Sequence, residues 1–106
     1  MPDDSQDTPV LNTIVAMTAA SVAECELAPD ALLLVRLAAL AAVEAPPLSY
    51  LLHIGPAVES GVTIDDAQNV LVAVAPIIGT ARTMKAAINI AEALELAIAV
   101  IAEGAQ

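Results

Sequence analysis

Residues 80–103, TARTMKAAINIAEALELAIAVIAE, decide the fold, because they predict one long helix that changes character halfway along its length. In the first half, four polar residues recur at steps of three and four, as in the polar stripe of an amphipathic helix. They are Arg82, Lys85, Asn89 and Glu92. From Leu96 to Ala102, two turns are apolar on every face. We expect such a segment to be covered on all sides, most simply by another subunit.

Two helices are predicted in the first part of the chain from residues that start and stop helices. The first begins at the Thr8-Pro9 pair, a helix cap followed by proline at the first helical position, and runs to about residue 24. The second runs from Pro29 to about residue 44. Its interior is polar only at Arg36, and a helix that is apolar on nearly every face is expected to be buried.

Two further helices fill the stretch between these and residue 80. The third is predicted from Pro47 to about residue 60, where a glycine ends it. The fourth begins at Thr63 and ends at Pro76 and Gly79. The sequence therefore predicts an all-α fold, a small bundle of about five helices. Residues 1–7 are expected to form a disordered acidic tail, and residues 8–106 a single domain.

The composition indicates that copies of the chain associate. Hydrophobic residues make up 58% of the sequence, yet Tyr50 is the only aromatic residue, and a domain of this size buries only about two-thirds of its unfolded surface. No apolar run approaches the roughly 18 residues of a membrane span. The chain is therefore predicted to be a soluble homo-oligomer that does not enter a membrane.

Charge and cysteine content narrow the function classes. Thirteen acidic residues against three basic ones give a formal net charge of −10, which disfavours nucleic acid and anionic membrane surfaces as partners. The acidic, polar start of the chain is unlike a signal peptide, so we expect a cytoplasmic protein. The lone Cys25 excludes an intrachain disulfide.

One group of side chains could carry chemistry. Ser49 and Tyr50 precede His53 by four and three residues on the predicted third helix, so both lie beside it on the helix surface. A histidine next to hydroxyls can act as a general acid or base near neutral pH. The alternative is a structural histidine bonded to a backbone carbonyl or to a neighbouring subunit.

Other residues give weaker evidence for a functional site. Arg36 is predicted either to pair with an acid or to clamp a substrate carboxylate. One histidine and a distant cysteine do not supply the three or four ligands of a zinc site, and Asp65-Asp66 is typical of a helix N-terminus. Glycine-rich phosphate loops are absent from the sequence. We therefore predict no metal site and no cofactor.

Five short stretches form a pattern across the chain: VRLA at 35–38, YLLH at 50–53, AVESG at 57–61, IDD at 64–66 and IIG at 77–79. Together they resemble the carboxymuconolactone decarboxylase family, which includes the alkylhydroperoxidase D-like proteins, over roughly residues 12–100. The resemblance implies the alkylhydroperoxidase D-like helical fold, assembled as a homotrimer or homohexamer.

The chain departs from the redox branch of that family. The two cysteines of the branch align with Pro46 and Ser49, and its proton-relay glutamate aligns near Leu33 or Leu34. Without thiols there is no dithiol redox chemistry. The resemblance is therefore to the branch without the two-cysteine motif.

In the decarboxylase branch, a histidine in a helical pocket would donate or accept a proton as carbon dioxide leaves. Here that residue would be His53, with Tyr50 and Ser49 lining the pocket. An anionic substrate would also need a cationic anchor, and Arg36 and Arg82 are the only arginines available.

Three hypotheses follow. The first is a non-thiol enzyme of the carboxymuconolactone decarboxylase type that acts on a small organic acid or lactone, with His53 as general acid or base. The second is a catalytically inactive oligomeric binding or scaffold protein with the same fold. The third, an alkylhydroperoxidase, is the weakest because the thiols are missing.

Overall fold

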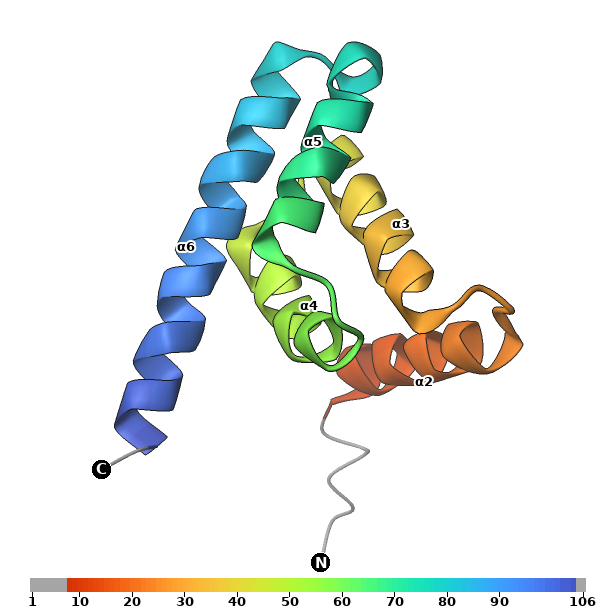
Figure 1. The fold of residues 1–106 in the computed structure, drawn as a ribbon. Helices are drawn as coiled ribbons and strands as arrows, with labels where there is room; N and C mark the ends of the chain where they lie inside the picture. Colours follow the sequence, from red (N-terminus) through yellow and green to blue (C-terminus); the bar gives the residue numbers. More distant parts are fainter. Residues whose placement is uncertain (1–7, 105–106) are drawn as a thin grey trace, which may run out of the picture.

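The computed structural model describes residues 8–104, so the predicted disordered tail at 1–7 lies outside the described residues. This part of the chain forms helices joined by short turns and contains no strand (Figure 1). The helices are α2 (Pro9–Glu24), α3 (Pro29–Ala42), α4 (Pro47–Glu59), α5 (Ile64–Ile78) and α6 (Thr80–Gly104). The predicted all-α class is therefore confirmed for residues 8–104.

The ends of α5 follow from its local chemistry. The Asp66 amide donates to the Thr63 hydroxyl oxygen at 3.1 Å, and the Thr63 amide donates to the Asp66 carboxylate at 2.9 Å. These two bonds satisfy backbone donors that the first turn leaves free. At the other end, Gly79 has a φ of 92°, which residues with a side chain rarely adopt, and turns the chain directly into α6.

The prediction that Pro76 terminates the fourth helix is wrong, because α5 continues through it to Ile78. Proline removes one hydrogen bond, the one to the carbonyl of Val72 a turn earlier. Pro76 and Val72 are both exposed, so water can replace the lost bond. The glycine that follows Ile78 ends the helix instead.

Helices α3 to α6 form the packed body of the molecule. Within it α4 packs on α6, α5 packs on α3 and α6, and α3 also contacts α4 and α6. Its buried cluster consists mainly of small side chains, which let the helix backbones approach closely. The members are Ala41, Ala45, Tyr50, Leu71, Ala86 and Ala93.

Asn89 links α6 to the turn between α3 and α4. Its carboxamide nitrogen donates to the backbone carbonyl of Ala45 at 3.1 Å, and the side chain is buried. The predicted polar stripe on the last helix is therefore wrong at Asn89, although Arg82, Lys85 and Glu92 are exposed. A polar amide at helical spacing suits either environment, and here a buried carbonyl provides its partner.

The expectation that the second helix is buried is also not met. In α3 only Leu33 and Ala41 are buried, and Val35 is 56% exposed. The reason is that α4, α5 and α6 are the helices that pack on α3, and α2 does not cover its remaining surface. The apolar residues on that side of α3 have no partner within the described part of the chain.

Helix α2 packs on none of the other helices of residues 8–104, and it has no buried residue. Figure 1 shows it crossing below the body, connected through the turn into α3. One side-chain bond joins the two helices, from the Arg36 guanidinium to the Ser21 hydroxyl oxygen at 2.8 Å. The apolar side chains of α2 therefore face outward on every side, Val10 and Met17 among them.

The end of α6, from residue 96 onward, resembles α2 in this respect. It extends past the ends of the other helices (Figure 1). Ile98, Val100 and Ile101 are each more than 60% exposed there. None of the described helices is both long enough and apolar enough to cross a lipid bilayer.

Candidate functional site

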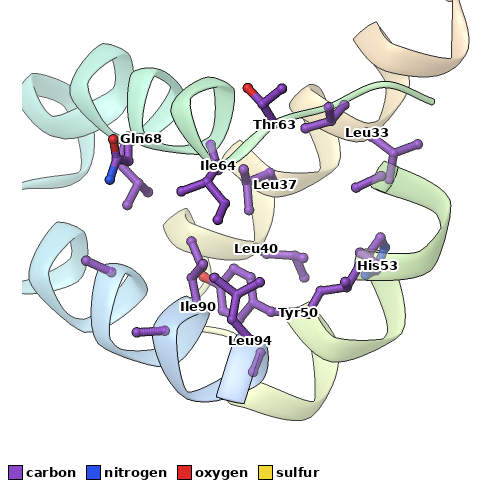
Figure 2. Close-up of a pocket in the computed structure, with 18 of the residues that line it drawn as sticks. Leu33, Leu37, Leu40, Tyr50, His53, Thr63, Ile64, Gln68, Ile90 and Leu94 are labelled. Atoms are coloured by element: carbon purple, nitrogen blue, oxygen red, sulfur yellow. The ribbon is translucent and has the colours of Figure 1, made fainter. Parts of the chain in front are cut away.

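A pocket lies between α3, α4, α5 and α6 (Figure 2), and it is partly open, since lining residues such as Ile64 and Gln68 are exposed. Its volume is about 270 Å³, close to the lower end of the range for small-ligand sites. Nearly every residue that lines it is apolar. The polar exceptions are Tyr50, His53, Thr63 and Gln68. The pocket therefore suits a small, mainly apolar molecule held by few polar contacts.

Tyr50 is the most deeply buried polar group of the pocket. Its side chain is only 3% exposed, and Leu40 and Ile90 pack against the cluster to which it belongs. Burial in this apolar setting raises the pKa of the phenol above its ordinary value of 10.0, so the group is neutral at physiological pH. Within residues 8–104 its hydroxyl has no hydrogen-bond partner.

His53 lies one turn further along α4 and is half-buried. Its Nδ1 is 2.7 Å from the backbone carbonyl oxygen of Ser49. A carbonyl can only accept, so Nδ1 carries the hydrogen and Nε2 is the ring nitrogen left to accept or give a proton. The bond also fixes the orientation of the ring on α4, in the manner that prepares a histidine for acid–base work.

The remaining predicted site residues lie elsewhere. Ser49 contributes its backbone carbonyl to His53, but its side chain does not line the pocket. Arg36 donates to Ser21 at the junction with α2, and neither it nor the exposed Arg82 is among the pocket residues. Within residues 8–104, therefore, the pocket brings together Tyr50 and His53 and leaves both arginines outside.

The described residues offer little for a metal or a redox group. Within residues 8–104 no three histidine, cysteine or acidic side chains come together as a metal site would require. Cys25 is half-buried in the turn between α2 and α3, away from the pocket. The two positions aligned with the family's cysteines, Pro46 and Ser49, lie outside the lining as well.

Sequence reasoning missed the apolar walls of the pocket. Leu33, Leu37 and Leu40 of α3 face it at steps of four and three, and Ile90 and Leu94 of α6 face them across the cavity (Figure 2). The helical period could have identified each row, but not which rows enclose a space. Leu33 is also one of the two positions that the resemblance aligns with the family's glutamate.

Comparison with protein-family models, with curated proteins and with solved structures finds no match to this chain. The resemblance to the carboxymuconolactone decarboxylase family therefore stays a prediction from the sequence. Function is therefore inferred from the chemistry of the pocket itself.

Proposed function

We propose that this chain is a non-thiol protein of the carboxymuconolactone decarboxylase type, which binds a small organic acid or lactone in the pocket and acts on it through His53. The observation that supports the proposal is the position of His53 and Tyr50 on one face of α4, both against a small apolar cavity. An apolar pocket with a few convergent polar groups is the usual form of a small-molecule site.

The hydrogen bond to Ser49 gives His53 a defined role in this chemistry. With Nδ1 occupied, Nε2 is the position that exchanges a proton with the bound molecule. In a decarboxylation, the carbon–carbon bond to the carboxylate breaks, its electron pair moves into the adjoining unsaturated system, and a carbon atom gains a proton. Protonated His53 supplies that proton through Nε2, and solvent restores it afterwards.

The lining also indicates how much charge a substrate can carry. His53, when protonated, is the one side chain of the lining that bears positive charge. A charged carboxylate is costly to bury without a cation, because it loses its hydration. We therefore place one carboxylate of the substrate next to His53, toward solvent, and the apolar part of the molecule deeper in the pocket.

The test is a screen of unsaturated lactone acids, followed by the variants His53→Ala and His53→Gln. Both should lose turnover, by about a hundredfold or more, because neither side chain can exchange a proton. His53→Gln should retain binding, since it fills similar space. Asn69→Ala, an exposed change on α5 outside the pocket, is the control. Unchanged turnover in His53→Ala would contradict the proposed role.

We also propose that copies of the chain assemble, as a homotrimer or homohexamer. The supporting observation is the apolar surface of α2 and of the last turns of α6, where large aliphatic side chains such as Val10, Met17 and Ile101 are mostly exposed. Contiguous apolar surface of this kind is typical of a protein–protein interface. Both surfaces belong to the same chain, which lets identical copies cover one another reciprocally.

The alternative function, an inactive oligomeric binding or scaffold protein, gains its support from the same surfaces. Such a protein would assemble through α2 and α6 yet show no turnover with any lactone acid. Light scattering at micromolar concentration measures the assembly independently of catalysis. A single subunit under those conditions would contradict the proposed oligomer and, with it, the scaffold alternative.

A further inference from the structure

The two polar side chains that are buried in the body differ in whether they have partners. Asn89 donates to the carbonyl of Ala45, whereas the Tyr50 hydroxyl has no partner in the described residues, although it is buried more deeply. Buried hydroxyls are normally hydrogen-bonded, because desolvation is otherwise uncompensated. A phenylalanine would fill the same volume without this cost. Tyr50 lines the same pocket as His53, and its hydroxyl oxygen has almost no surface open to solvent.

We infer that the Tyr50 hydroxyl is the buried anchor of the ligand, to which it donates a hydrogen bond, and that the ligand carries an uncharged oxygen at that end. This inference rests on the proposed function, whose pocket it uses, and adds the chemical class of the buried group. A lactone carbonyl, a ketone or an ester fits this description.

The surroundings of Tyr50 exclude a carboxylate as that buried group. Its neighbours in the cluster are alanines and leucines, and neither arginine lines the pocket. A single neutral hydroxyl does not offset the lost hydration of an ion in such a place. The ligand is therefore amphipathic along its length. Its neutral oxygen lies deep beside Tyr50, and its single acidic group lies at the half-buried His53.

Burial keeps the phenol of Tyr50 in the protonated form that can donate a hydrogen bond. The pKa of Tyr50 lies above its ordinary value of 10.0 because of desolvation, so the hydroxyl keeps its proton and remains a donor throughout the physiological range. The donor is also rigidly held, since its ring is packed within the cluster of the body. Little conformational entropy is lost when a ligand binds to a group held in this way.

The experiment compares two acids that differ only in the buried end. One is a saturated γ-lactone with an acetate side chain, and the other is cyclopentylacetate, which has the same ring size and the same carboxylate but no other oxygen. Binding is measured by NMR titration of the full chain. Wild type should bind the lactone acid about tenfold more tightly, as expected for one hydrogen bond in an apolar site.

Tyr50→Phe should reduce this affinity ratio to near one, and it should leave the affinity for cyclopentylacetate unchanged. Asn69→Ala should keep the wild-type ratio. Equal affinities of wild type for the two acids, or a ratio that survives in Tyr50→Phe, would overturn the inference. The second result is expected if another group binds the lactone oxygen. Unchanged turnover in His53→Ala would contradict the proposed function, whereas the affinity ratio of the two acids tests only the role of Tyr50. The failure of one proposal can therefore be told from the failure of the other.

A second measurement uses the fact that Tyr50 is the only aromatic residue of the chain. The ultraviolet absorbance of tyrosinate therefore reports this one group. A hydrogen bond donated to the ligand stabilises the neutral phenol, so the lactone acid should move the alkaline titration of Tyr50 to higher pH. Cyclopentylacetate should move it by clearly less. Equal shifts with the two acids would contradict the anchoring role.

Discussion

Helices α2 and α4 are similar in sequence and opposite in environment. Each begins with a proline in its first turn and lacks a side-chain cap, and each is rich in aliphatic residues. Yet α4 packs on α3 and α6 and buries Tyr50, whereas α2 packs on no other described helix. Apolar content thus does not determine where a helix lies. A helix without one distinct apolar face needs partners on several sides, and the body offers α2 none.

The comparison also separates two kinds of surface. The exposed part of α4 is the outside of a helix whose inner face is packed. In α2 no face is packed against the other described helices, and this is the surface proposed above for association. The difference predicts that equivalent substitutions in the two helices damage different properties, folding in one and association in the other.

The largest effect is expected from a matched pair of substitutions to glutamate. Ile54→Glu places a charge where α4 packs on the buried cluster, and we expect loss of the fold, because an unpaired buried charge costs several kcal/mol. Ile14→Glu lies on α2, where the side chain is 49% exposed. It should leave the helical circular dichroism intact but reduce the mass measured by light scattering. Unfolding by Ile14→Glu would show that α2 supports the body directly.

An intermediate effect is expected at Asn89, which joins α6 to the chain just before α4. Asn89→Leu leaves the carbonyl of Ala45 without its donor, at a cost of about 1–3 kcal/mol in the free energy of unfolding. Urea denaturation monitored by circular dichroism measures it. Asn69→Ala, an exposed amide on α5, should change stability by less than about 0.5 kcal/mol. Similar values for the two variants would argue against a structural bond at Asn89.

The smallest effect is expected at the junction of α2 and α3. Ser21→Ala removes the hydroxyl that accepts from Arg36, but both groups are solvent-accessible, so we expect a loss below about 1 kcal/mol. Urea denaturation gives this value, and light scattering should show an unchanged mass. A loss of assembly in Ser21→Ala would instead mean that this bond sets the position of α2 for association.

Much of the fold could be predicted from the sequence, because helix ends depend on local chemistry. Pro9 at the start of α2, the cap at Thr63 before α5, and the turn at Gly79 all lie where the sequence places them. The exceptions depend on tertiary surroundings. Pro76 is tolerated where water can reach the backbone, and Asn89 is buried because a carbonyl from another turn meets it.

The candidate site was predictable to a similar degree. Tyr50 and His53 are three residues apart on one helix, and this spacing alone places them on the same side. The predicted positions of Arg36 and Arg82 at the substrate involve contacts between different helices, and no local pattern carries that information. The unpaired state of the Tyr50 hydroxyl likewise depends on what the other helices bring to it.

The alanines of the buried cluster affect how the pocket can change shape. An alanine has no side-chain torsion to rotate. The part of the cluster formed by Ala41, Ala86 and Ala93 therefore cannot adapt to a different ligand by changing rotamers. Adjustment to a bulkier molecule can come from rotamer changes of the branched side chains in the lining, such as Leu37 and Leu40 of α3. Directed changes of ligand preference should therefore begin at those leucines.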